Sequence, residues 1–524
     1  MKRIIVLIIA IFTISIANAQ QHTFSKVFYT NTDSVQAYSI VTTYDHNLII
    51  VGEINNIALV LKMDKVGNII WNKRLGVKSI LYSIVNTNDS CFVIAGTIYN
   101  SINLTNDILC VKINVDGDTI WSKAIDMGYN DYANTVQLTN DNAYIISGYS
   151  QLTPTSSRIA VAKLDSTGNL LWCNTYAGGL TFNCANTIKQ MPDSSYILTG
   201  YVSDSSNTSY YGYAYYSKPF LMNLTTSGAI NWSKTASYFI SGIDVAITPN
   251  GLLCYLVNEF ENKTIVLKTD FTGNVLWSNI FNLGGVFPPL SVLSKICNTS
   301  DSCYVIVLPY EYSPILASTL MKFTKDGNLL LTKGLSAYAT AVIETEDKGL
   351  MIVGNGPIIM YVTKSPTTIN PQIGIIKTDS VGNGTSCVLQ SSVSQVPIAI
   401  TMAPSIFTTA EAGLVNSLHL IPINITLDTI SGCVNVYTIG GVVERTTTDN
   451  LSIYPNPTKD NLTIETNLNK EQRLEIINLI GQTVYTNIIN NKKATVNTSA
   501  FAKGVYILKL SSDKETVVRK FVKE

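Results

Sequence analysis

A motif that recurs along most of the chain constrains its fold more than any other feature. In its fullest form it is an apolar run ending in Lys-x-Asp, a glycine turn, and a second run that reaches Trp four residues after the glycine, as in LKMDKVGNIIW at 61–71. The turn glycines, spaced by 50, 51, 60, 45, 54 and 55 residues, are Gly67, Gly117, Gly168, Gly228, Gly273, Gly327 and Gly382. All five tryptophans follow such a glycine: Trp71, Trp121, Trp172, Trp232 and Trp277. A self-similar period of about 50 residues indicates one structural unit copied along the chain.

A second recurrent piece lies between successive copies of this motif. It is a polar turn followed by a strongly apolar run, for example TVQLTNDNAYIISGYS at 135–150. Each repeat therefore has four strand-sized segments rich in Val, Ile, Tyr and Thr, and four strands in about 50 residues are typical of a β-propeller blade. Counted from the strand-like segment 22–30, the repeats predict an all-β fold with a seven-bladed β-propeller over residues 20–387, its last blade ending near Asp379.

The chemistry of the repeated turn indicates a structural role. Asp64 can accept hydrogen bonds from the backbone ahead of it, and Gly67 can adopt a positive φ. We expect the Trp of each repeat to pack against the neighbouring blade. A lysine stands two residues before the turn position and lies on the same strand face as the turn Asp. The sequence therefore predicts a local ion pair between the two side chains. These lysines are Lys62, Lys112, Lys163, Lys268, Lys322 and Lys377.

Two other interpretations of these turns stay open. The carboxylates could bind metal, although each turn offers one or two oxygens where Ca²⁺ requires several; these are Asp64, Asp165, Asp270 and Asp379. The lysines could form a ligand-binding ring around the channel. We assign no metal ligand, cofactor-binding residue or catalytic residue from the sequence.

The Gly-Asn-x-x-Trp pattern resembles the tryptophan-docking turn of quinoprotein-like propellers, in which Gly and Trp lock adjacent blades. The resemblance covers five of the seven repeats. The chain has no adjacent pair of cysteines, which the quinoprotein dehydrogenases use beside their quinone. The sialidase Asp box is superficially similar but has other spacings. Neither activity is therefore carried over.

The N-terminus predicts export. The basic residues Lys2 and Arg3 precede the apolar run 4–16 and the sequence Ala17-Asn18-Ala19, which together indicate a signal peptide over residues 1–19. An apolar run of this length is short of the roughly 20 residues that span a bilayer, so we expect no transmembrane anchor.

The cysteines leave their pairing open. Their number is nine, so at least one is unpaired within a monomer. Cys297 and Cys303 flank a hairpin turn and could bridge across it, whereas Cys91 and Cys110 on apolar strands are expected to be small core residues. Cys387 and Cys433 bracket a segment that lacks the repeat, residues 388–447, which we interpret as a β-rich linker.

Residues 448–524 form a separate module of short alternating strands. This module resembles the type A C-terminal sorting domain of the type IX secretion system of Bacteroidota. The resemblance implies a small Ig-like β-sandwich that the type IX machinery recognises, that directs export across the outer membrane and that is commonly removed. The residues that match the motif are Tyr454, Pro455, Asn456, Pro457, Gly481, Gly504, Tyr506, Arg519 and Lys520.

Composition favours recognition over catalysis. Lys plus Arg (36) balance Asp plus Glu (36) and only three His are present, which disfavours nucleic-acid binding and a multi-histidine centre. We therefore predict a secreted or cell-surface, non-catalytic binding or adhesion propeller, with surface glycans or proteins as partners. The Tyr-rich insertion 202–219 suits such contacts.

Two alternatives remain. One is a secreted polysaccharide hydrolase or lyase that uses acidic residues at the channel, with Glu53, Glu259 and Glu311 as candidates. The other is a purely structural component of the cell surface.

Overall fold

The computed structural model describes the chain in segments. They are residues 23–30, 33–179, 181–203, 217–236, 241–258, 263–282, 295–309, 318–355, 372–385, 388–390, 394–398, 400–418, 420, 422–425, 427–431, 451–466, 471–478, 482–511 and 516–524. The predicted signal peptide, most of the 202–219 insertion, Cys387 and Cys433 lie outside these residues. Within them, no helix has the length and apolar character needed to cross a membrane.

Every element of the described chain is a β-strand, so the all-β prediction is confirmed. Residues 35–377 form antiparallel sheets of successive strands. In sequence order the strands are β2 (Val35–Thr42), β3 (Leu48–Ile54), β4 (Ile57–Met63) and β5 (Ile69–Asn86); β6 (Phe92–Asn100), β7 (Thr105–Ile113) and β8 (Thr119–Asp126); β9 (Asp131–Leu138), β10 (Tyr144–Thr153), β11 (Ser156–Leu164) and β12 (Leu170–Ala177); β13 (Phe182–Gln190), β14 (Tyr196–Ser203), β15 (Ser217–Leu224) and β16 (Ile230–Ala236); β17 (Ser241–Thr248), β18 (Gly251–Asn258), β19 (Lys263–Thr269) and β20 (Val275–Asn282); β21 (Ile296–Asn298), β22 (Tyr304–Pro309), β23 (Ser318–Phe323) and β24 (Leu329–Leu335); β25 (Tyr338–Glu344), β26 (Leu350–Asn355) and β27 (Ile373–Lys377).

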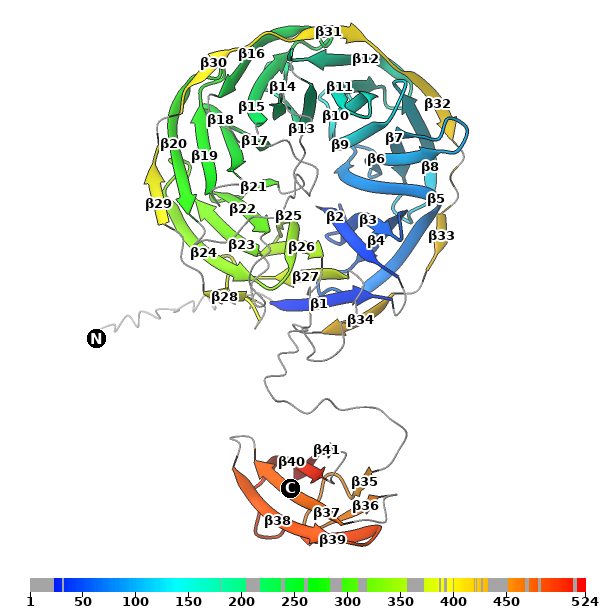
Figure 1. Cartoon of the computed structure of the whole chain (residues 1–524), viewed down its shortest axis with the longest axis vertical. Coiled ribbons are helices and arrows are strands. Elements are labelled where there is room, and N and C mark those ends of the chain that lie inside the picture. Colours follow the sequence, from blue (N-terminus) through cyan, green and yellow to red (C-terminus); the bar gives the residue numbers. More distant parts are fainter. Residues whose placement is uncertain are drawn as a thin grey trace, which may run out of the picture. The chain divides into compact units, whose positions relative to one another are not determined.

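These sheets resemble propeller blades. Figure 1 shows them around a common centre, with β2, β9, β13, β17 and β25 innermost. The long strand β5 leaves the outer edge of one sheet, where it pairs with β4, and pairs with β6 in the next. The first strand, β1 (Phe24–Tyr29), pairs with β27, and Phe24 lies opposite Lys377. The N-terminal strand β1 thus joins the sheet that contains β25, β26 and β27, the last strands of the repeat region.

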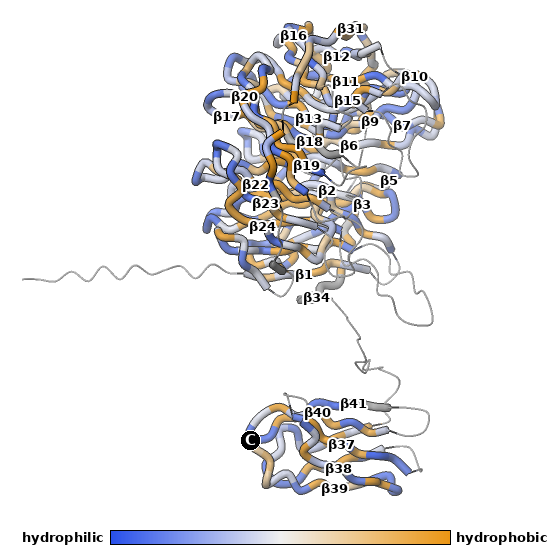
Figure 2. The backbone as a smooth tube through the Cα atoms, turned by 60° about the vertical axis from the view of Figure 1, so that its left-hand side comes forward, coloured by the Kyte–Doolittle hydropathy of each residue, from blue (hydrophilic) through white to orange (hydrophobic). Residues whose placement is uncertain are grey.

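The hydrophobic core lies between neighbouring sheets. One cluster, for example, joins Ile145 and Val161 of the β9–β12 sheet to Leu198, Phe220 and Met222 of the β13–β16 sheet. Figure 2 shows the corresponding pattern, with hydrophobic residues along the strands and hydrophilic residues at the turns. Since each sheet buries both faces against its neighbours, its middle strands are almost continuously apolar, as sheets covered on both sides require.

The described residues between 388 and 431, here called the outer belt, add strands to the existing sheets. Each belt strand pairs antiparallel with the outermost strand of one sheet, and Figure 1 shows them around the periphery. The pairs are β28 (Val388–Gln390) with β24, β29 (Ser394–Pro397) with β20, β30 (Met402–Pro404) with β16, β31 (Thr408–Glu411) with β12, β32 (Leu414–Leu418) with β8, β33 (Pro422–Asn424) with β5, and β34 (Asp428–Ser431) with β1. The belt therefore visits the sheets in the reverse of their sequence order.

Serines that directly follow a Trp hold the belt by side-chain hydrogen bonds. Ser122 Oγ donates to the carbonyl of Leu418 at 2.8 Å, and Ser233 Oγ donates to that of Ser405 at 2.6 Å. Ser278 Oγ makes the same contact with the Ile398 carbonyl. Belt side chains that are buried against the sheets are Ile400, Phe407, Leu420 and Leu427.

The C-terminal residues form a separate compact unit. A sheet of β35 (Leu451–Tyr454), β36 (Asn461–Thr466) and β39 (Lys493–Asn497) accompanies a sheet of β37 (Gln472–Asn478), β38 (Thr483–Ile489), β40 (Gly504–Ser511) and β41 (Thr516–Lys523). Residues from both sheets share one core, which contains Leu462, Ile464, Ile476, Leu508 and Phe521. Every second residue along β36 and β40 is buried, as expected for strands that turn one face to the core.

Candidate functional site

Each repeated Trp packs on the turn glycine of the following repeat. A Cβ on Gly117 would lie 2.7 Å from Cη2 of Trp71, and Gly117 has a φ of +77°. The Trp71 indole also donates to the Val115 carbonyl at 3.3 Å, and that of Trp172 donates to the Thr226 carbonyl at 3.1 Å. The same contacts join Trp121 to Gly168, Trp172 to Gly228, Trp232 to Gly273 and Trp277 to Gly327. Phe24 on Gly67 and Leu331 on Gly382 take the place of Trp in the other two copies.

We predict that Gly117→Ala destabilises the protein more than Gly179→Ala. Both glycines have positive φ, but a Cβ on Gly179 meets no atom within 4 Å. Gly179→Ala therefore reports backbone strain alone, about 1–2 kcal/mol. Gly117→Ala adds a clash with Trp71 that costs about 1–3 kcal/mol more. Thermal unfolding of both variants measures the difference, and equal melting temperatures would contradict the docking contact.

The recurrent lysines do not bind the Asp two residues away. Lys62 Nζ binds Asp45 at 2.9 Å, and Lys112 Nζ binds Asp89 at 2.7 Å; both carboxylates belong to the turn between the two preceding strands. Asp64 instead accepts the backbone amides of Val66 and Asn68 in its own turn. The equivalent pairs are Lys163 with Asp141, Lys322 with Asp301, and Lys377 with Asp347.

The local ion pair expected from the sequence is therefore wrong, because the turn carboxylate is already engaged by its own backbone. Burial disfavours ionisation of Asp89, but hydrogen bonds from Lys112 and Thr87 outweigh it and lower the pKa of Asp89 to about 2. Five of the six recurrent lysines thus form scaffold ion pairs, each within one sheet. Lys268 instead donates to the Thr248 hydroxyl.

The cysteines of the described chain are free thiols. Cys297 faces Val305 across its hairpin, so Cys303 is not its cross-strand partner, and the suggested bridge is absent. Cys110 is fully buried, and burial raises the pKa of its thiol. It is a small core residue, whereas Cys91 is half-buried.

Of the three glutamates suggested for a catalytic channel, only Glu53 belongs to the described residues. It lies in β3, is buried, and accepts a hydrogen bond of 2.8 Å from the Tyr38 hydroxyl. Burial raises the pKa of Glu53 against that hydrogen bond. Glu259 and Glu311, the other candidates of the hydrolase or lyase alternative, lie outside the described residues.

A cavity of about 290 Å³ lies where the first repeat meets the last, lined by His46, Leu48, Lys65, Glu346 and Lys377 among others. His46 Nδ1 is 3.3 Å from a carboxylate oxygen of Glu346. The strand that begins at Leu48 corresponds to strands that begin with Tyr144 and Tyr196 in later repeats.

At two other seams these tyrosines lie beside the strand lysines, with Lys112 Nζ 6.0 Å from the Tyr144 ring centroid and Lys163 Nζ 5.8 Å from that of Tyr196. At the seam of the cavity, the smaller Leu48 and Lys377 line the space.

In the C-terminal unit, the Tyr-Pro-Asn-Pro motif contacts the end of the chain. Asn456 Nδ2 donates to the Lys520 carbonyl at 3.1 Å, and the Val522 amide donates to Asn456 Oδ1 at 2.9 Å. Tyr506 is buried, stacks on Phe521 with ring centroids 5.5 Å apart, and donates to the Ala502 carbonyl.

The remaining motif residues are spread along the same unit. Tyr454 donates to Glu465, and Lys493 binds both residues. Arg519 and Lys520 lie in β41, Gly504 begins β40, and Gly481 lies outside the described residues. The motif thus brings the start of the unit and its last strand together.

Residues 452–524 match the family of secretion system C-terminal sorting domains. This unit is a type IX secretion sorting domain. The protein is therefore secreted across the outer membrane, onto the cell surface or beyond, as the sequence predicted.

No curated protein matches the chain. Among solved structures, the chain is similar to PorZ, a surface component of the type IX secretion system of Porphyromonas gingivalis, with 10% identity, a TM-score of 0.39, and coverage of 91% of this chain and 58% of PorZ. It is also similar to a protein of unknown function from Bacteroides caccae (10% identity, TM-score 0.34, 59% of this chain and 93% of that one). A glucose dehydrogenase matches at 9% identity and a TM-score of 0.32, over 56% of this chain and 95% of the enzyme.

Proposed function

We propose that the protein is a secreted, non-catalytic binding module: a seven-bladed β-propeller over residues 20–387, ringed by the outer belt and delivered by a removable, Ig-like sorting domain at 448–524. The observation that carries the proposal is the internal pairing of the recurring charges. Lys62 with Asp45 and Lys112 with Asp89 are scaffold contacts. Recognition is therefore left to residues that differ between repeats.

Two variable features suit a polar partner such as a surface glycan or protein. One is the Tyr-rich insertion 202–219, known here from its sequence. The other is the cavity at the first and last repeats, where His46, Lys65 and Glu346 offer hydrogen-bonding groups beside apolar Leu48. Aromatic and hydroxyl-rich surfaces with a few polar groups favour sugar and protein contacts.

The test is a binding screen of the full chain against surface glycans and proteins, run beside a hydrolysis assay on the same sugars. For a ligand that binds, we expect Lys65→Ala or deletion of 204–216 to weaken affinity about tenfold, equivalent to about 1.4 kcal/mol. Lys325 occupies the same turn position in a later repeat, so Lys325→Ala is the matched control.

The outcomes separate the alternatives. Unchanged affinity in both test variants contradicts recognition by these two features. Release of sugar products by the full chain would instead support the hydrolase or lyase alternative. Absence of any soluble ligand, together with self-association, would favour a structural component of the cell surface.

A further inference from the structure

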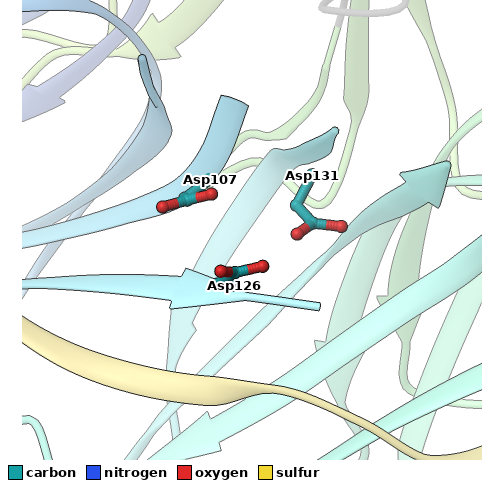
Figure 3. Close-up of side chains that lie close together, drawn as sticks. All are labelled: Asp107, Asp126 and Asp131. Atoms are coloured by element: carbon teal, nitrogen blue, oxygen red, sulfur yellow. The ribbon is translucent and has the colours of Figure 1, made fainter. Parts of the chain in front are cut away.

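Three aspartates converge where β7, β8 and β9 meet. Asp107 lies in β7, Asp126 ends β8 and Asp131 begins β9. One carboxylate oxygen from each lies within 4.8 Å of the other two, and Figure 3 shows the three side chains around a common space. Asp107 and Asp131 are 2% and 0% exposed, and Asp126 is half-buried. Carboxylates are almost never buried in this way unless a partner compensates their charge.

Each of the three carboxylates accepts a hydrogen bond, and Asp126 Oδ1 accepts the Gly128 amide at 2.8 Å. Asp107 Oδ2 accepts from Asn100 at 3.0 Å, and Asp131 Oδ2 accepts the Met127 amide at 2.7 Å. The other oxygens of Asp107 and Asp131 are buried and have no hydrogen-bond partner among the described residues. None of the three forms a salt bridge within that part of the chain. The cluster therefore has buried acceptors, and no Lys, Arg or His among the described residues forms an ion pair with it.

The neighbouring repeats show that the scaffold does not require these charges. Asp107 stands five residues before the strand lysine, and Asp126 stands five residues after the Trp. The preceding repeat has Ile57 and Gly76 at these positions, and the following repeat has Arg158 and Ala177.

Asp131 has a neutral counterpart in the next repeat. Asn183, the second residue of β13, accepts the Gly178 amide at 3.0 Å, as Asp131 accepts the Met127 amide at 2.7 Å. An amide oxygen therefore supports this backbone turn without a charge. The negative charge of Asp131 is additional to what the fold uses.

The cluster suits a hard divalent cation with oxygen ligands. Ca²⁺ binds carboxylate and amide oxygens at about 2.3–2.6 Å in irregular geometry, so its opposite ligands lie about 4.6–5.2 Å apart. The three carboxylate oxygens fall within that span. Mg²⁺ requires shorter bonds of about 2.0–2.1 Å in near-octahedral geometry, which loosely converging side chains serve less well.

We propose that Asp107, Asp126 and Asp131 bind one Ca²⁺ ion and that this ion ties the end of β8 to the start of β9. Extracellular Ca²⁺ modules commonly bind with a Kd of about 10⁻⁴–10⁻³ M, and a site with three carboxylates on a secreted chain is expected in that range.

Calorimetric titration of the EDTA-treated full chain with CaCl₂ tests the site. We expect one Ca²⁺ per chain and a rise in Tm of about 2–3 °C at 10 mM Ca²⁺. Asp126→Asn and Asp131→Asn should each weaken Ca²⁺ binding at least tenfold and abolish the rise in Tm. Asp126 is half-buried and Asp131→Asn reproduces the Asn183 arrangement, so both variants should fold.

Asp116→Asn is the matched control, because Asp116 is an exposed carboxylate on the neighbouring turn of the same repeat. It should leave Ca²⁺ affinity and the rise in Tm unchanged. Absence of Ca²⁺ binding by the unmodified chain, or an equal rise in Tm in all three variants, overturns the proposal. Tighter binding of MgCl₂ than of CaCl₂ overturns the assignment to Ca²⁺.

Discussion

Deleting residues 388–431 from the chain is expected to lower its Tm by more than 10 °C and to cause self-association. The deletion removes the strands that cover the outer edges of the sheets, and uncovered edges pair with other chains. It also removes the buried anchors Ile400, Phe407, Leu420 and Leu427, each of which stabilises the fold by about 1.5–3 kcal/mol. Thermal unfolding and size-exclusion chromatography measure the two effects.

A point variant measures the contribution of one buried belt side chain to stability without removing the belt strands. Phe407 is buried and lies 5.5 Å from the Phe220 ring, whereas the adjacent Ile406 is 87% exposed. Phe407→Ala should cost about 3–5 kcal/mol, and Ile406→Ala should be neutral. A belt deletion that leaves Tm and the monomeric state unchanged would show that the sheets are stable without it.

Truncation of residues 516–524 is expected to reduce export more than tenfold. These residues form β41, which pairs along the whole of β40 and carries the fully buried Phe521. They also contact Asn456 of the Tyr-Pro-Asn-Pro motif. Without them the sorting domain loses part of its core, so the secretion machinery should not recognise it. Immunoblots of periplasm, cell surface and medium measure the distribution.

Substitution of Phe521 tests the same dependence on the folded sorting domain with a smaller change than the truncation. Phe521→Ala should impair export, because it removes the partner of Tyr506 from the core of the sorting domain. Val484→Ala is the matched control, since Val484 is exposed in the same unit. Normal export of the truncated chain would mean that the signal does not depend on the folded domain.

Much of the architecture could be predicted from the sequence because it is encoded locally. Apolar runs and turn glycines recur in every repeat, and the Gly–Trp spacing recurs in five of the seven, so the strands and their all-β class follow from short segments. The C-terminal motif was equally recognisable, because Tyr454–Pro457 and Lys503–Tyr506 are contiguous in sequence. The role of the outer belt was not predictable, because its partners lie up to several hundred residues away, as with Lys26 and Ser431.

The belt contacts of the serines and the aspartate cluster were not predicted from the sequence, because they too depend on which residues the fold brings together. The Trp-Ser dipeptides that hold the belt were visible at Ser122, Ser233 and Ser278, but a serine carries no signal until its acceptor is known. Comparison of equivalent positions between repeats could have singled out Asp107, Asp126 and Asp131, since no neighbouring repeat has three carboxylates there.

The sequence by itself determined the repeat, the class of fold and the route of export. Only the tertiary structure decided which groups meet: Lys62 with Asp45 rather than Asp64, the belt with the outer sheet edges, and three aspartates from three strands. The physical reason is that strand formation depends on neighbours along the chain, whereas pairing depends on which donors, acceptors and edges remain free once the local turns have used their own.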